Sequence, residues 1–154
     1  MKISEIIAPE RVAIDIDLSS KKAVLERLSN MLSSADPGLS AKAVFDSLLA
    51  RERLGTTGLG AGIAIPHGRV ATDAASIGAF IRTDNPIGFD AVDNAPVDLF
   101  FALCVPENAN EEHLALLSEL ATKFSDGQFV EGLRNSADPS DVFRHLIADP
   151  CSEL

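Results

Sequence analysis

Aromatic residues, cysteines and long apolar runs are all scarce in this sequence. The chain has no Trp and no Tyr, so aromatic platforms on which nucleobases stack are not expected. Only two cysteines occur among 154 residues, which excludes the disulfide framework of a small secreted protein. The longest apolar run is 99–105, far short of the about 18 residues that a membrane-spanning helix needs. The first five residues include an acid, and no signal peptide is recognisable.

Basic residues are also few. Lys and Arg total 13 against 23 Asp and Glu, giving a net charge of −10. Nucleic-acid binding depends on Lys and Arg that neutralise phosphates, so a nucleic acid is not an expected partner. The low cysteine content and the absence of signal and membrane segments predict a cytoplasmic protein that does not insert into membranes.

Hydrophobic periodicity predicts one α/β domain over residues 1–154. Apolar residues recur at helical spacing after Ser20 and after Ser40, both of which suit helix N-caps. A further helix is expected to begin after Asn108 or Asn110, followed by two short ones. Strands are predicted at 11–17, 63–65, 75–81, 86–89 and 97–105, the last buried on both faces. This mixture indicates a sheet covered by helices.

A glycine-rich stretch occupies residues 55–62 but does not have the spacing of a nucleotide-binding loop. No Lys occurs between Lys42 and Lys123, which excludes a P-loop, and the glycines precede a strand instead of following one. Two interpretations stay open. The stretch is a tight helix-to-strand connection, or it is a loop whose backbone N–H groups face an anion.

His67 follows a predicted strand and lies between Pro66 and Gly68. Residues 54–68 are uncharged, and residues 51–69 sum to +2 because three arginines outnumber one glutamate. Arginines at both ends of a Gly/Thr loop favour an oxyanion pocket, in which the hydroxyl groups of Thr56 and Thr57 are candidate donors. The alternative is an ordinary surface or core histidine.

Other uses of histidine have little support. The three histidines, His67, His113 and His145, lack metal-ligand spacing, so no metal site is expected. No Gly-x-Ser-x-Gly occurs, which argues against a serine hydrolase.

Residues 51–69, which read RERLGTTGLGAGIAIPHGR, resemble the phosphorylation-site signature of the fructose/mannitol-type enzyme IIA domains of the bacterial phosphotransferase system. Residues 89–106 and the segment with His113 match too, and the likeness extends over about 3–147. Within the family the sequence is most similar to the nitrogen-regulatory branch. The resemblance implies a mixed sheet of about five strands sandwiched between α-helices.

The resemblance also implies site roles. His67 would accept a phosphoryl group on Nε2, Arg51 would stabilise that group, and His113 would lie beside it. Thr56, Thr57, Gly68 and Arg69 are the candidate phosphate neighbours. The donor would be an HPr-like carrier of the NPr type. No cofactor is needed, and the chain would be a phosphotransferase-system component, not an independent turnover enzyme.

Three function classes remain open. A regulatory switch would act on target proteins such as potassium transporters or sensor kinases. The lack of an appended IIB or IIC segment favours this class. A sugar-specific IIA would pass its phosphate to an EIIB domain for carbohydrate uptake. An interaction module would never be phosphorylated.

Overall fold

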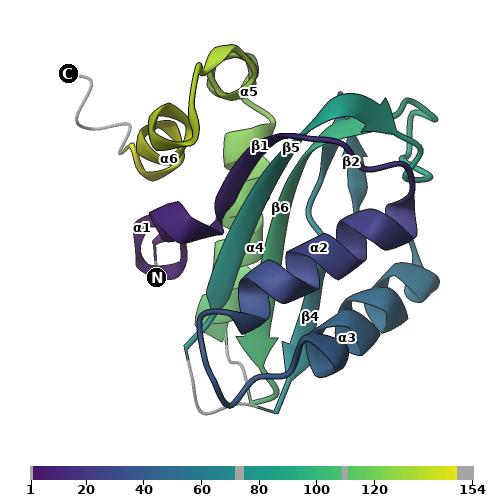
Figure 1. The fold of residues 1–154 in the computed structure, drawn as a ribbon, viewed down its shortest axis with the longest axis vertical. Coiled ribbons are helices and arrows are strands. Elements are labelled where there is room, and N and C mark those ends of the chain that lie inside the picture. The colour runs from purple at the N-terminus through teal and green to yellow at the C-terminus, as the bar shows by residue number, and fades with distance from the viewer. Residues whose placement is uncertain (1, 72–74, 109–110, 149–154) are drawn as a thin grey trace.

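A mixed β-sheet lies between two groups of helices in the computed structural model (Figure 1). The structure describes residues 2–71, 75–108 and 111–148, without the side chains of 112–114. In chain order the elements are α1 (Ile3–Ile6), η1 (Pro9–Arg11), β1 (Val12–Ile16), α2 (Lys21–Ser33), α3 (Ala41–Leu54), β2 (Gly58–Gly60), β3 (Ile63–Ala64), β4 (His67–Val70), β5 (Ile77–Ile87), β6 (Val97–Pro106), α4 (Glu111–Phe124), α5 (Gly127–Asn135) and α6 (Pro139–Ile147).

The six strands occupy five positions in the sheet. The order is β1-β5-β6-β3-β2, and β4 also pairs with β6. Ile63 in β3 is opposite Leu99, and His67 in β4 is opposite Leu103, so β3 and β4 follow the same register along β6. They are one interrupted strand, because Pro66 between them has no N–H for the ladder. β5 is antiparallel to β6, which makes the sheet mixed, as predicted.

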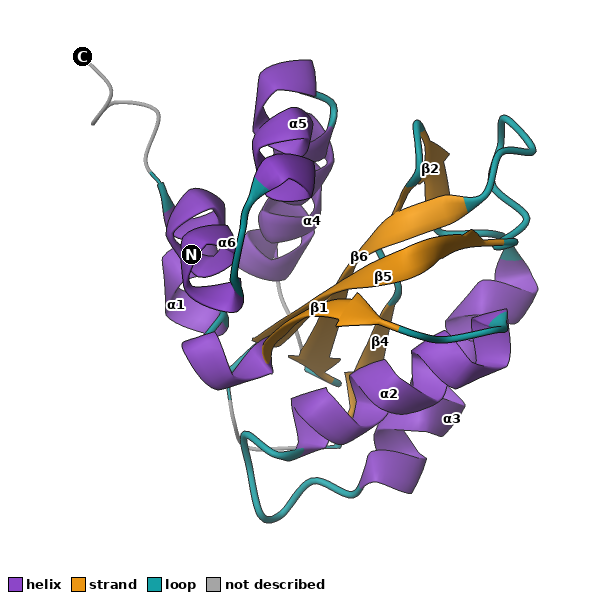
Figure 2. Ribbon diagram, turned by 45° about the horizontal axis from the view of Figure 1, so that its top comes forward, coloured by secondary structure: helices purple, strands orange, loops and turns teal. Residues whose placement is uncertain are grey.

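Helices cover both faces of this sheet (Figure 2). α2 and α3 pack on one face, while α1, α4, α5 and α6 pack on the other. Strand β6 supplies both cores by the period of two, with Phe100 and Cys104 facing α2 and α3 and with Phe101 and Leu103 facing the opposite helices. The prediction that this strand is buried on both faces is confirmed.

The predicted N-caps are also present. Ser20 Oγ accepts a hydrogen bond from Ala23 N at 3.1 Å, and Ser40 Oγ accepts one from Ala43 N at 3.0 Å. The two helices therefore begin where the sequence indicates.

Two strand predictions need correction. β5 does not end at 81 but continues to Ile87, through the separate strand expected at 86–89. Pro86 is accommodated because the pairing with β6 is irregular between Arg82 and Ile87. The chain also resumes as a strand at His67, where Pro-His-Gly suggested an end. The short strand β2 and helix α1 lay outside the predicted elements as well.

Candidate functional site

His67 is the first residue of β4, and its ring orientation is fixed by the backbone two residues earlier. Its Nδ1 lies 2.9 Å from the carbonyl oxygen of Ile65. A carbonyl oxygen only accepts hydrogen bonds, so Nδ1 carries the proton of the neutral ring. The lone pair is then on Nε2, for which no partner exists among the described side chains.

The half-buried position of His67 lowers the pKa of its imidazole from 6.5, mainly because burial disfavours the charged ring. The bond to Ile65 and the negative charge of Glu52 raise this pKa, and the positive charge of Arg51 lowers it. Burial has the largest effect and the net shift is downward, so the neutral form of the ring predominates at pH 7.

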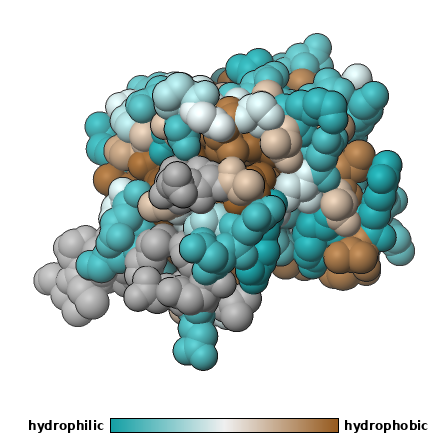
Figure 3. Space-filling view, turned by 90° about the horizontal axis from the view of Figure 1, so that it is seen from below, coloured by the Kyte–Doolittle hydropathy of each residue, from teal (hydrophilic) through white to brown (hydrophobic). Residues whose placement is uncertain are grey.

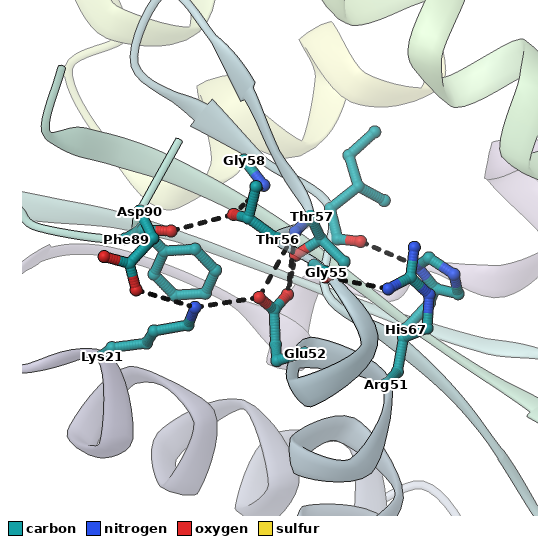
Figure 4. A network of polar contacts seen from close by, with 11 residues as sticks. Lys21, Arg51, Glu52, Gly55, Thr56, Thr57, Gly58, His67, Phe89 and Asp90 are labelled. Carbon is teal, nitrogen blue, oxygen red and sulfur yellow. Dashed lines mark hydrogen bonds and ion pairs between the residues drawn. The ribbon is translucent and has the colours of Figure 1, made fainter. Parts of the chain in front are cut away.

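Arg51 lies in the last turn of α3, and its guanidinium group is beside the His67 ring (Figure 4). Its Nη1 donates to the carbonyl oxygen of Gly55 at 2.9 Å, which anchors the side chain at the helix end. A cavity of about 400 Å³ is lined by both residues and by Arg69. The remaining lining is mostly apolar and comes from α3, β6 and α4: Ala50, Leu54, Leu103, Val105 and Leu117. The cavity therefore joins an imidazole and two guanidinium groups to an apolar surface.

Figure 3 looks onto the end of the molecule where β4 and β6 end, and hydrophobic surface is exposed there between hydrophilic side chains.

Arg69 in β4 lines the cavity, but its Nη1 also lies 3.3 Å from the carbonyl oxygen of Glu107. Its guanidinium group retains further N–H donors for an anion.

Gly68 lines the cavity from the strand that carries His67, and its role in the structure is close packing. A Cβ atom at this position would lie 2.3 Å from Ser47 Oγ of α3. The absence of a side chain lets α3 approach β4 closely, which brings Arg51 to His67.

The hydroxyl groups of Thr56 and Thr57 are used inside the protein. Thr56 donates to the carbonyl oxygen of Phe89 at 2.9 Å, and Thr57 donates to the carboxylate of Glu52. Each hydroxyl has a single proton. Both residues line a second, smaller hollow that Arg51 and His67 also line. In this structure the two hydroxyl groups therefore fix the loop that borders the histidine, and their donation to a phosphoryl group stays a prediction.

Sequence reasoning gave no role to Glu52 and none to Lys21. Glu52 is buried, and its carboxylate is 3.0 Å from Lys21 Nζ. The sequence offers only a weak indication of these contacts. An acid directly follows Arg51, and a threonine stands five residues after that acid.

His113 lies in the first turn of α4, and its side chain is outside the described residues. Among the residues that the structure describes, no group of three or more His, Cys, Asp or Glu side chains is placed to hold a metal ion. Within the same residues, no helix has both the length and the apolar character needed to span a membrane.

Comparison with known proteins finds both nitrogen regulatory proteins and fructose-specific components of phosphotransferase systems among the relatives of this chain. The family described as "Phosphoenolpyruvate-dependent sugar phosphotransferase system, EIIA 2" matches residues 5–149. A nitrogen regulatory protein of Pseudomonas aeruginosa is 40% identical over 97% of this chain and 96% of its own length. The crystal structure of the nitrogen regulatory protein IIA-Ntr from Neisseria meningitidis has a TM-score of 0.87 and 46% identity, covering 94% of this chain and 98% of that one.

A more distant structure shares the fold alone. The mannitol IIA of Escherichia coli has a TM-score of 0.72 with 20% identity, and the similarity covers 91% of this chain and 98% of that one.

Proposed function

The chain belongs to the EIIA 2 family of the phosphoenolpyruvate-dependent sugar phosphotransferase system, and on that basis we propose that His67 accepts a phosphoryl group at Nε2 from the phosphohistidine of an HPr-like carrier. The observation that carries the proposal is the hydrogen bond from Nδ1 to the Ile65 carbonyl, since it leaves the Nε2 lone pair free for attack. The lowered pKa of His67 supports it, because only the neutral ring is nucleophilic.

In the transfer step, Nε2 of His67 attacks the phosphorus atom. A new N–P bond forms while the N–P bond to the carrier's imidazole breaks, and that imidazole leaves with the bonding electron pair. The Nδ1 proton stays on His67, where the Ile65 carbonyl stabilises the positive charge that develops on the ring. Phosphoryl transfer passes through a loose transition state with negative charge on the equatorial oxygens. Arg51 and Arg69 provide donors for that charge.

His113 is proposed to lie beside the phosphoryl group and to donate a hydrogen bond to it. Its place in the first turn of α4 is compatible with this role, because Leu117 of the same helix lines the cavity. We expect His113→Ala to slow the transfer without abolishing it.

The consequence of phosphorylation is proposed to be regulatory. Two relatives with 40% and 46% identity over nearly the whole chain are named nitrogen regulatory proteins, which supports this class over sugar uptake. A phosphoryl group adds about −1.5 to −2 charge at pH 7, next to an apolar surface that suits protein docking. The switch would operate in the cytoplasm, with an NPr-type carrier as the donor and with potassium transporters or sensor kinases as target classes.

The acceptor residue is tested with phosphoenolpyruvate labelled in its phosphate, enzyme I and an NPr-type carrier. The wild-type chain should gain acid-labile phosphate, and His67→Gln should gain none. The matched control is His145→Gln, which changes a histidine of α6 outside the cavity and should keep the wild-type rate. Phosphorylation of His67→Gln at the wild-type rate would refute the assignment.

The regulatory role is tested by affinity capture with the phosphorylated and unphosphorylated chain, His67→Ala and His67→Asp. A switch predicts that the set of captured proteins differs between the phosphorylated and unphosphorylated chains. Identical sets for all four samples contradict the switch. Rapid transfer of the phosphate to a sugar-specific EIIB domain would instead support the carbohydrate-uptake alternative.

A further inference from the structure

Glu52 is a buried carboxylate that the proposed transfer step does not use. Its side chain is tied to two elements, with Lys21 Nζ of α2 at 3.0 Å and the backbone N–H of Thr57 at 3.2 and 3.3 Å from its two oxygens. The Thr57 hydroxyl donates to it as well. Burying a carboxylate is costly unless it is paired and hydrogen-bonded, and here it is both (Figure 4).

These contacts continue as a chain of hydrogen bonds to His67. The carbonyl oxygen of Thr57 accepts from the N–H of Ile65 at 3.0 Å. The carbonyl oxygen of Ile65 then accepts from Nδ1 of His67 at 2.9 Å. Thr57 is therefore held by the Glu52 carboxylate at its N–H and hydroxyl, and it holds Ile65 in turn.

We propose that Glu52 is a positioning residue, which acts through Thr57 on the Ile65 carbonyl and so keeps the His67 proton on Nδ1. Without that constraint the neutral ring would distribute its proton between both nitrogens, and a proton on Nε2 blocks the attacking atom. The consequence for transfer rate rests on the proposed function. The consequence for the tautomer is a property of the unphosphorylated protein.

Lys21 completes the arrangement. Its ammonium group is 4.5 Å from the centre of the Phe89 ring and 3.5 Å from the Asp90 carboxylate, so several contacts fix its position. It supplies the positive charge that lets the carboxylate of Glu52 remain buried. Glu52→Gln would turn an amide NH₂ toward this ammonium group or toward the backbone N–H of Thr57, and both of these groups are donors that cannot accept its hydrogen bond.

The test compares Glu52→Gln with Glu26→Gln, a matched change at an exposed residue of α2 that pairs with Lys22 at 3.9 Å. The ¹⁵N shifts of the imidazole nitrogens report the tautomer of His67. We expect wild type and Glu26→Gln to show the Nδ1–H form, and Glu52→Gln to show a mixture. Phosphorylation by the carrier should slow in proportion to the loss of the Nδ1–H form, about twofold for an equal mixture, with an unchanged KM for the carrier.

A second pair keeps the proposal falsifiable if Glu52→Gln does not fold. Thr57→Val removes the hydroxyl and keeps the side-chain volume, and we expect a shift of the tautomer in the same direction. Thr57→Ser restores the hydroxyl and should restore the wild-type spectrum. Such rescue is not expected if Thr57 only fills space.

Two results separate this proposal from the proposed function. If Glu52→Gln, or Thr57→Val in its place, keeps the wild-type tautomer and rate while only its melting temperature falls, Glu52 is structural and the positioning role is wrong. If the wild-type chain itself gains no phosphate, the proposed function fails. The ¹⁵N spectra then still decide whether Glu52 sets the tautomer.

Discussion

At the scale of single residues, the reactivity of His67 depends on the pKa of its imidazole, because a protonated ring cannot attack. Burial is the largest influence and lowers the pKa of the ring, Arg51 lowers it further, and the Ile65 carbonyl and Glu52 oppose the change. The same arginine that would stabilise a phosphoryl group thus also helps to keep the acceptor neutral. Both effects need the positive charge of Arg51, but only phosphate binding needs its forked geometry.

A first prediction concerns pH. The His67 imidazole should titrate with a midpoint below 6.5 in an NMR titration, and the rate of phosphoryl acceptance should fall to half of its high-pH value only at a pH below 6.5. Arg51→Gln should raise this pKa because a neighbouring positive charge is lost, whereas Arg27→Gln, an exposed change on α2, should not. Titration of wild-type His67 at or above 6.5 would contradict the argument.

The sign for stability follows from the same shift. Because the folded-state pKa is depressed, the unfolded chain binds more protons as pH falls through the unfolded value of about 6.5. The contribution of His67 therefore lowers the free energy of unfolding as pH falls below 6.5, until the folded ring is protonated as well. His67→Gln should remove this part of the pH dependence in urea unfolding.

At the scale of secondary-structure elements, the site depends on how closely α3 approaches β4. Arg51 comes from the end of α3 and His67 from the start of β4, and Gly68 faces Ser47 at their contact. Ser47 Oγ in turn donates to the carbonyl oxygen of Arg69 at 2.7 Å, which fixes the strand against the helix. The spacing of the two functional side chains is thus set by packing that neither of them makes.

A second prediction tests this packing. Gly68→Ala places a Cβ atom 2.3 Å from Ser47 Oγ, and such overpacking costs about 1–3 kcal/mol. We expect the free energy of unfolding to fall by that amount in urea titrations, and Ser47→Ala in the same chain to restore part of it. Gly127→Ala is the control, because nothing lies within 4 Å of a Cβ atom there. Equal stability of the two glycine variants would show that α3 and β4 adjust freely.

The elements that the sequence predicts well are those with local signals. Ser20 and Ser40 cap helices as expected, and the apolar run of β6 is a strand buried on both faces. β4 was missed because Pro-His-Gly breaks a strand locally, whereas pairing with β6 restores it. Long-range pairing decided the outcome there.

In the candidate site, too, the features with a local sequence signal were predicted and those that depend on long-range contacts were not. The resemblance to the enzyme IIA family, carried by residues 51–69, is confirmed by the family match over 5–149. The fold brings His67, Arg51 and Arg69 to one cavity. The contacts of Thr57 and Glu52 could not be predicted, because the partner of Glu52 is Lys21, 31 residues earlier in the chain and on another helix. A local pattern does not report which distant cation will neutralise a buried acid.

At the scale of the whole molecule, the sheet separates two hydrophobic cores, and β6 contributes to both. Opening either core requires separating helices from this strand, so the two cores are expected to unfold together. Cys104 is a natural reporter, since it lies on β6 in the core that α2 and α3 cover. Burial raises the pKa of its thiol to about 11.

The last prediction uses that thiol. The thiolate is the reactive form of cysteine. With a pKa of about 11, only about one Cys104 thiol in a thousand is ionised at pH 8, and burial also keeps the reagent away from it. In a chain with Cys151→Ser, we expect a thiol reagent to modify Cys104 only at the rate of global unfolding, equal to the slowest amide exchange in β6. Gly68→Ala should accelerate labelling in proportion to its loss of stability, and the double variant lacking both thiols gives the background. Labelling much faster than exchange would mean that α2 or α3 detaches from the sheet on its own, and the two cores would then be independent units.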